Sequence, residues 1–318
     1  MSRMNAATAR GLGLLAGYAA DRLFGDLRRG HPVAGFGSLA QRLEDRIHAD
    51  SRARGILHNV LLVGGAGALG IAAERLAGRP AARFVLTALA TWTVLGGRSL
   101  EREADAVHAL LNAGDLPGAR LRLTHLVGRD TAELDAAEVS RAVIESVAEN
   151  TSDAVVAPLV WGAVAGVPGL LGYRAANTLD AMVGHHNARY ERFGWASARL
   201  DDLLNLPGSR LTGLLTLAVR PSRAQHAWRA WRRDAAGHPS PNAGVAEATF
   251  AGSLGVRLGG RNVYYGGRVE DRPTMGEGRA ASPSDIPRTN QQARHVGLAA
   301  AGVCAATARL IGRSEASR

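Results

Sequence analysis

The stretch from Ala154 to Tyr173 reads AVVAPLVWGAVAGVPGLLGY and contains no charged residue. A helix needs about 20 predominantly apolar residues to cross a hydrocarbon core of roughly 30 Å, so this stretch predicts a membrane span. Pro158 and Pro168 lie inside it, and prolines interrupt a membrane helix where its backbone lines a cavity within the protein. We therefore expect a broken helix beside an internal cavity.

Apolar runs elsewhere in the chain predict further helices. Gly55–Ala73 is of similar length, whereas Phe84–Gly97 and Val296–Ala308 need tilt or burial in a bundle to cross a membrane. The short runs also suit buried helices of a soluble α-helical protein, and this alternative stays open. Candidate membrane helices lie near residues 8–24, 55–76, 82–98, 154–173, 203–219 and 294–312.

The pattern predicts an all-α, polytopic helical membrane protein that forms a single domain over residues 1–318. Gly13 and Gly17 are spaced to let two membrane helices pack closely. From Asp234 to Gln292 the chain is rich in Gly, Pro and Ser and loses helical periodicity. We expect a Gly/Pro-rich loop region there, flexible over residues 271–292, before a last helix that starts near residues 285–291.

The basic residues of this chain are all arginine. Lysine is absent, so the 38 basic residues include no Walker-type phosphate-binding lysine and no lysine for a Schiff base. Arginine suits bidentate binding of carboxylate and phosphate, although a GC-rich genome would produce the same bias. The single cysteine, Cys304, excludes a disulfide framework and a cysteine-based metal cluster.

Two segments carry patterns with competing interpretations. Trp228 and Trp231 lie among arginines between Arg220 and Arg233, which suits either an amphipathic helix at an anionic lipid surface or a solvated helix with two buried tryptophans. This basic cluster favours the cytoplasmic side of a membrane. Glycines at positions 65, 67 and 70 spell a dinucleotide-binding pattern, but the expected acidic residue about 20 positions later is missing, so we interpret them as part of a membrane helix.

A row of polar residues leads directly into the span. Its members recur at steps of three and four residues, so they share one face of a helix. A solvated stripe accounts for the first two, whereas Glu149 and Asp153, with Asn150 beside them, lie at the membrane boundary, where charge usually serves a function. The row consists of Glu138, Arg141, Glu145, Glu149 and Asp153.

A second polar group follows the span. Carboxylates and amides are ligands for a hard cation such as Mg²⁺, and arginines bind phosphate, so this group predicts a site for a metal and a phosphorylated substrate. Adjacent residues of a helix point about 100° apart and no third ligand has suitable spacing, which disfavours zinc at His185 and His186. The group consists of Asn177, Asp180, His185, Arg189, Arg199, Asp201 and Asp202.

A third group, His238-Pro239-Ser240-Pro241-Asn242, predicts a rigid polar loop because two prolines fix its backbone. An alternative interpretation makes Asn242 the N-cap of a helix. We expect the loop to cover the same cavity as the two groups before it.

These motifs, together with Phe193–Asp202, resemble the adenosylcobinamide-phosphate synthase family of cobalamin biosynthesis. The resemblance extends to Asp21–Asp26, His31-Pro32-Val33 and Gly255–Gly267, and so covers nearly the whole chain. It implies an enzyme of the bacterial cytoplasmic (inner) membrane with several spans. Such an enzyme joins an aminopropanol phosphate to a propionate carboxylate of a corrinoid acid, with ATP as cosubstrate and Mg²⁺. The family pattern predicts Lys or Arg near position 186, where this chain has His186, and Arg189 would take over the phosphate contact.

The resemblance assigns roles as follows. Because a carboxylate is a poor electrophile, ATP would activate it, and a general base would deprotonate the amine. The partners are then a corrinoid acid, an aminoalcohol phosphate and the lipid bilayer, with no nucleic acid; a homo-oligomer is left open. The predicted residues are Glu145, Glu149 and His185 for catalysis; Asn150, Asn177, Arg189, Arg199, His238, Ser240 and Asn242 for substrate binding; and Asp153, Asp180, Asp201 and Asp202 for the metal.

Two other functions remain alternatives. A non-catalytic membrane protein that binds, transports or senses a ligand would also present a polar cluster beside apolar spans. A soluble dinucleotide-binding enzyme is the third option. Product formation separates the enzyme from the first rival, and membrane fractionation separates it from the second.

Overall fold

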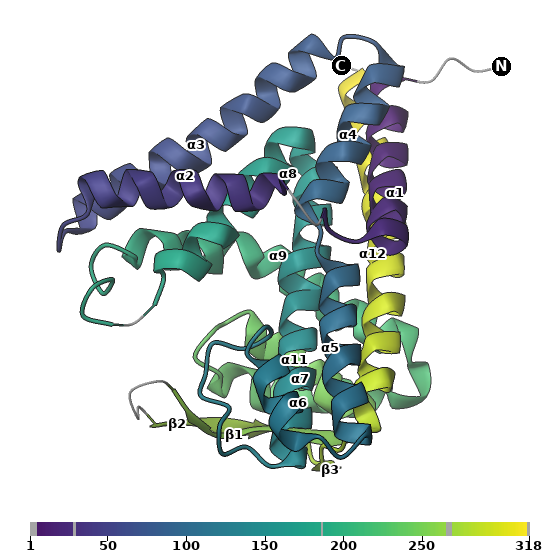
Figure 1. Cartoon of the computed structure of the whole chain (residues 1–318). Coiled ribbons are helices and arrows are strands. Elements are labelled where there is room, and N and C mark those ends of the chain that lie inside the picture. The colour runs from purple at the N-terminus through teal and green to yellow at the C-terminus, as the bar shows by residue number, and fades with distance from the viewer. Residues whose placement is uncertain (1–4, 28–29, 186, 265–268, 317–318) are drawn as a thin grey trace. The chain divides into compact units, whose positions relative to one another are not determined.

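The computed structural model describes residues 5–27, 30–185, 187–264 and 269–316, mostly as helices (Figure 1). The chain divides into two compact units. Unit 1 consists of Met1–Gly96, Ala157–Pro207 and Ala300–Arg318, and unit 2 consists of Gly97–Val156 and Gly208–Ala299. Both units are discontinuous in sequence, and the single domain predicted over residues 1–318 stays a prediction.

Unit 1 is helical throughout its described residues. Gly13 and Gly17 of α1 lie against Thr87 and Thr91 of α4, where a Cβ on either glycine would collide with the threonine side chain. This confirms the close helix packing predicted from the glycine spacing. The unit contains α1 (Ala6–Phe24), α2 (Pro32–Ile47), α3 (Arg52–Leu76), α4 (Pro80–Val94), α8 (Ala157–Val183), the first part of α9 (Trp195–Val219) and the last part of α12 (Asp285–Ala316).

The predicted break in the apolar span lies at Gly166. Its φ of 67° is in the left-handed region, which glycine adopts without strain. The backbone N–H of Val167 donates to Glu74 Oε1 at 2.9 Å, so α3 supplies an acceptor at the break. A Cβ on Gly70 of α3 would lie 2.6 Å from Pro168 Cα. The glycines of the dinucleotide-like pattern therefore belong to a helix that packs on α8.

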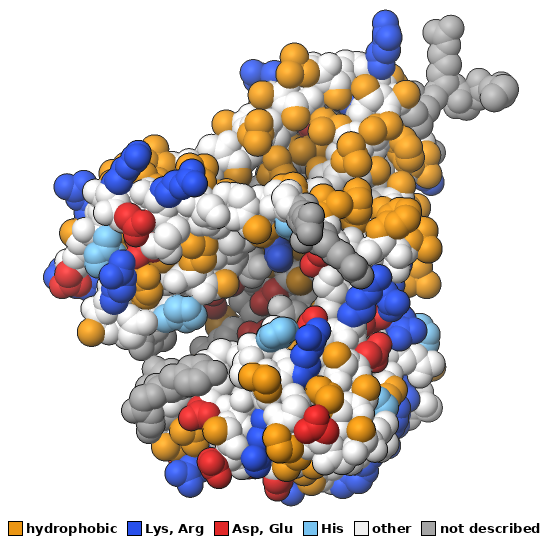
Figure 2. Space-filling view, in the orientation of Figure 1, with side chains coloured by type: hydrophobic (Ala, Val, Ile, Leu, Met, Phe, Trp, Pro, Cys, Tyr) orange, Lys and Arg blue, Asp and Glu red, His pale blue; other side chains and the backbone are white. Residues whose placement is uncertain are grey.

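Three helical stretches among the described residues are long and apolar enough to cross a membrane: Arg52–Leu76, Ala136–Val183 and Asp285–Gly312. Large hydrophobic side chains on α3, such as Val60, Leu69 and Leu76, are exposed. Figure 2 shows hydrophobic side chains gathered over the part of unit 1 that contains α1 and α4. These features indicate a membrane protein.

Unit 2 is organised around α11, whose residues are all buried. Helix α11 packs against α7, α10 and β1. Between α7 and α8 the chain forms one π-helical turn that contains Asp153. The unit contains α5 (Gly97–Asn112), α6 (Leu116–Leu123), α7 (Ala136–Thr151), the π-helix η1 (Ser152–Val156), the rest of α9, the 3₁₀ turn η2 (Pro221–Arg223), α10 (Ala224–Asp234), the 3₁₀ turn η3 (Ala235–Gly237), α11 (Ala243–Leu254), three strands and the first part of α12.

The strands correct the all-α prediction. They are β1 (Val256–Val263), β2 (Val269–Met275) and β3 (Arg279–Ala280), in the order β2-β1-β3, with β2 antiparallel and β3 parallel to β1. A bulge with Gly259 at φ 81° interrupts β1. Sequence analysis missed this sheet because glycines weaken a strand pattern and mark bulges.

The predicted flexible segment over residues 271–292 contains the end of a strand and the start of a helix. Strand β2 extends to Met275 because it pairs with β1, a long-range interaction that local composition does not show. Helix α12 already begins at Asp285, which agrees with the predicted start of the last helix. Asp285 Oδ2 accepts from the Ser282 backbone N–H at 3.0 Å at this helix start.

Candidate functional site

Two carboxylates of α7 and one of α11 line a cavity of about 140 Å³ in unit 2, which we call the acidic cavity. Glu145 and Glu149 are one helical turn apart on α7, as the sequence predicted, and Glu247 of α11 joins them. Arginines flank these acids. The lining residues are Leu126, Val127, Gly128, Arg129, Ala142, Glu145, Ser146, Glu149, Glu247, Tyr264 and Arg272.

Glu145 attaches the β1 bulge to α7. Its Oε1 accepts from Arg141 Nη1 at 3.1 Å and from the Gly259 N–H at 2.8 Å, and its Oε2 accepts from Arg129 Nη2 at 2.9 Å. Arg129 and Arg141 both donate to Asn262 as well. Two guanidinium groups and one backbone N–H thus occupy both oxygens of this carboxylate. These contacts make Glu145 a structural anchor, and the catalytic role predicted for it stays a prediction.

Glu247 has the opposite surroundings. The residue is 1% exposed, and neither carboxylate oxygen has a hydrogen-bond partner among the described residues. Burial, with the negative charges of Glu145 and Glu149 nearby, raises the pKa of Glu247 well above its usual value. A buried carboxyl group with free oxygens and a raised pKa is typical of a proton-transfer residue.

His238 and Arg272 lie beside Glu247. His238 Nε2 is 3.6 Å from Glu247 Oε1 and 3.2 Å from Arg272 Nη1. Burial and the Arg272 charge lower the pKa of His238, so the ring is neutral at pH 7. Arg272 also donates to Glu270 Oε1 and Tyr264 Oη, each at 2.9 Å. These contacts fix its guanidinium group at the cavity wall, where it can bind an anion.

The 238–242 loop is held by its own hydrogen bonds. The Ser240 N–H donates to His238 Nδ1 at 3.0 Å, and Ser240 Oγ accepts from the N–H groups of Asn242 and Ala243 at the start of α11. Asn242 occupies the N-cap position but makes no side-chain cap bond. Its Oδ1 accepts from Ser209 Oγ and Arg210 Nη1 instead. Ser240 therefore caps this helix, and Asn242 binds α9.

The remaining predicted residues of the α7 row lie near the π-helical turn. Asn150 donates to the Ser146 backbone oxygen at 2.9 Å. Asp153 lies within the turn itself. Such turns often occur at functional sites.

Part of the predicted polar group after the span forms a network in unit 1. Asp201 Oδ1 accepts from Asn177 Nδ2 at 3.2 Å, and Oδ2 accepts from Asn205 Nδ2 at 2.8 Å. Burial raises the pKa of Asp201 to about 6, although the two amide hydrogen bonds oppose the shift. Asn205 in turn accepts from Tyr173 Oη at 2.6 Å. The amides orient this carboxylate from two helices, α8 and α9.

The other members of that group lie elsewhere in unit 1. Arg199 is exposed and lies 3.8 Å from Asp202. Arg189 donates to Glu44 Oε1 at 2.9 Å, so its charge is already balanced by a carboxylate that is 1% exposed. His185 is exposed. His186 lies outside the described residues.

The predicted metal ligands fall in both units, with Asp153 in unit 2 and Asp180, Asp201 and Asp202 in unit 1. The described part of the chain holds no group of three or more His, Cys, Asp or Glu residues arranged for a metal ion. Mg²⁺ is often bound by one or two carboxylates together with substrate phosphates. The acidic cavity offers carboxylate oxygens of this kind on Glu149 and Glu247, and the metal stays a prediction.

Sequence reasoning missed Arg129, Glu247 and Arg272 as site residues. For Glu247 a signal existed, because it is the only charged residue in the otherwise apolar and small-residue segment Ala243–Leu254. Arg129 and Arg272 had no such signal, since many arginines of this chain lie in polar segments.

Comparison with known proteins gives the family. The family model described as CobD/Cbib protein matches residues 14–293. The chain is 50% identical to a cobalamin biosynthesis protein CobD of Mycobacterium tuberculosis over 92% of this chain and 94% of the relative. Proteins of the same name from Geobacter metallireducens and Rhodobacter capsulatus are 47% and 45% identical, over 85% and 82% of this chain and 87% and 84% of theirs. No solved structure matches. The resemblance seen in the motifs is thereby confirmed, and the chain belongs to the CobD/Cbib family of cobalamin biosynthesis proteins.

Proposed function

We propose that this protein is an acid-amine ligase that forms an amide bond at the acidic cavity. The amine of (R)-1-aminopropan-2-ol O-phosphate, or of aminopropanol, would join the propionate carboxylate of adenosylcobyric acid, with ATP as the source of energy, to give adenosylcobinamide phosphate. Family membership supports the pathway and the motif resemblance supports the reaction. One observation carries the assignment to this cavity: the carboxyl group of Glu247 is buried without a hydrogen-bond partner in a cavity that Arg129 and Arg272 also line.

The reaction needs an activated carboxylate. In the simplest route a propionate oxygen attacks the γ-phosphorus of ATP and ADP leaves, which gives an acyl phosphate. The amine nitrogen then attacks the acyl carbon, phosphate leaves with the bonding electrons, and the nitrogen loses a proton. Two groups are therefore required from the protein: cations that bind phosphate and a base that accepts the proton.

The acidic cavity holds both kinds of group. Glu247 would accept the proton, because its raised pKa makes it a stronger base than an ordinary carboxylate. Arg129 and Arg272 would bind phosphate oxygens. Mg²⁺, held by Glu149 and phosphate oxygens, would neutralise charge on the phosphates. A volume of about 140 Å³ suits the small aminoalcohol phosphate and the reacting carboxylate, with the rest of the corrinoid outside.

Reconstitution tests the proposal. Full-length protein, purified in detergent, is incubated with adenosylcobyric acid, aminopropanol phosphate, ATP and Mg²⁺, and the amide is detected by mass spectrometry. We expect a product that requires all four components. Omitting the protein and omitting ATP are the controls. Tight corrinoid binding without any product would contradict the proposal and favour a ligand-binding or transport protein.

The metal is tested in the same assay. Chelation of Mg²⁺ should stop product formation, and re-addition should restore it. Asp180→Asn and Asp202→Asn test the metal set predicted from the sequence, whereas Glu149→Gln tests the acidic cavity. Full activity in Glu149→Gln would remove Glu149 from the metal site.

A further inference from the structure

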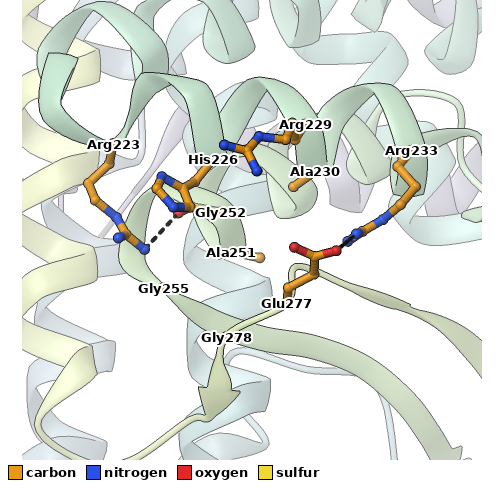
Figure 3. Close-up of a pocket in the computed structure, with 10 residues that line it drawn as sticks. All are labelled: Arg223, His226, Arg229, Ala230, Arg233, Ala251, Gly252, Gly255, Glu277 and Gly278. Atoms are coloured by element: carbon orange, nitrogen blue, oxygen red, sulfur yellow. Dashed lines mark hydrogen bonds and ion pairs between the residues drawn. The ribbon is translucent and has the colours of Figure 1, made fainter.

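A second cavity of unit 2 has the opposite charge. It measures about 220 Å³ and lies between α10, the end of α11 and the segment that joins β2 to β3, and we call it the basic cavity (Figure 3). It shares no lining residue with the acidic cavity. The lining residues are Arg223, His226, Arg229, Ala230, Arg233, Ala251, Gly252, Gly255, Glu277 and Gly278.

Helix spacing places His226, Arg229 and Arg233 on one side of α10, and Arg223 directly precedes this helix. Positions 226, 229 and 233 recur at steps of three and four residues, so the side chains project from one face (Figure 3). Gly252 lets α11 approach this helix closely, since a Cβ there would lie 2.5 Å from the His226 backbone oxygen. On the other face of α10, Trp228 is exposed and Arg232 lies over its ring.

Two glycines that line the basic cavity allow their neighbours to approach closely. Gly255 ends α11 with φ 73°, and a Cβ there would lie 2.7 Å from Arg223 Nη2. Gly278 lies so close to the Gly255 backbone that any side chain would collide with it. The guanidinium group of Arg223 therefore lies directly against the backbone of Gly255. Glycine commonly occupies positions where the backbone must approach another group this closely.

The charges of the basic cavity are only partly balanced. Arg233 pairs with Asp234 and Glu277. For Arg223 and Arg229 no carboxylate partner exists among the described residues, and Arg223 makes only a 3.5 Å contact with the Gly252 oxygen. Burial, with the charges of Arg288 and Arg223 nearby, lowers the pKa of Arg220. Positive charges thus repel one another here, and an anion would relieve that repulsion.

We propose that the basic cavity binds a phosphate group through Arg223, His226 and Arg229. Planar guanidinium groups bind phosphate oxygens bidentately, and a volume of about 220 Å³ holds a phosphate or a diphosphate. The group belongs either to a soluble phosphate compound or to the headgroup of an anionic lipid, since both present the same chemistry. The phosphate site stands whether or not the chain forms an amide bond.

Binding measurements on the full-length chain test the site in two arms. In the first, inorganic pyrophosphate is titrated calorimetrically into protein in nonionic detergent. In the second, thermal unfolding is compared in nanodiscs of phosphatidylcholine alone and with phosphatidylglycerol. We expect binding in one arm, weakened about tenfold or more in Arg229→Gln, which loses charge-assisted hydrogen bonds.

A neighbouring arginine provides the matched control. Arg232→Gln removes the same charge from the same helix but outside the basic cavity, and should bind within about twofold of wild type. Arg223→Gln should behave as Arg229→Gln does, and unfolding temperatures without ligand show that each variant is folded. Pyrophosphate binding identifies a soluble phosphate, and a response to phosphatidylglycerol identifies a lipid. Wild-type behaviour of Arg229→Gln in both arms, or no response of the wild type to either probe, would overturn the site.

Discussion

Replacing Glu145 with alanine removes the acceptor that Arg129, Arg141 and the Gly259 N–H share. Arg129 is then left 7% exposed with one neutral acceptor, Asn262. Breaking a buried ion pair in this way costs about 3–5 kcal/mol, because an uncompensated charge stays buried. For a unit of this size, each kcal/mol of lost unfolding free energy lowers the unfolding temperature by about 2–4 °C. The unfolding temperature of Glu145→Ala should therefore fall by on the order of 10 °C.

Thermal unfolding of the detergent-purified protein measures this effect. The matched control is Glu133→Gln, a change at an exposed residue of the same unit that should leave the unfolding temperature almost unchanged. A double-mutant cycle with Arg129→Ala isolates the pair, and the double variant should be more stable than additivity predicts by at least about 0.5 kcal/mol. An unfolding temperature for Glu145→Ala close to that of Glu133→Gln, or strict additivity in the cycle, would refute the anchoring role.

Three further changes test the fold around the sites. The folded form favours a protonated Asp201, so the unfolding temperature should fall as the pH rises from 3.8, the usual pKa of the group, to about 6, its pKa in the folded protein. The slope of unfolding temperature against pH should be smaller in Asp201→Asn. An identical slope in both proteins would argue against the buried carboxyl group. Gly166→Ala forces a left-handed φ on alanine and a collision with Glu74, so it should destabilise the fold by about 1–2 kcal/mol or more and lower the unfolding temperature. The control is Gly172→Ala, where the added methyl group meets open space and should not lower the unfolding temperature. Equal effects of the two changes would argue against the break at Gly166. Ser240→Ala removes the cap of α11 and should lower the free energy of unfolding by about 1 kcal/mol, which a denaturant titration can detect. An unchanged free energy of unfolding would show that the cap does not stabilise the protein.

The features that could be predicted from the sequence are those set by residues close together in the chain. The two prolines of the apolar run predicted a broken helix, and the structure places the break at Gly166, two residues before Pro168. The spacing of Glu145 and Glu149 predicted their shared face on α7. The resemblance gave the family before any comparison. Each of these depends on residues close together in the sequence.

Long-range contacts were not predictable in the same way. The acceptor for the Val167 N–H comes from Glu74, more than ninety positions earlier, and the residue that caps α11 is Ser240 rather than Asn242. The β1–β2 pairing was hidden by glycines that the bulge requires. The sequence marks Glu247 as the only charged residue of its segment, but it does not show that its carboxylate oxygens are buried without hydrogen-bond partners.

The rate of amide formation by Glu247→Gln, measured beside the wild type, tests the central claim most directly. Loss of a general base lowers the rate about 10²–10⁴-fold, while a neutral amide in place of a buried carboxyl group should leave the unfolding temperature equal or higher. We predict this combination of lost activity and retained stability. A folded Glu247→Gln protein that makes the amide within about threefold of the wild-type rate would contradict the claim, because a general base contributes far more than that.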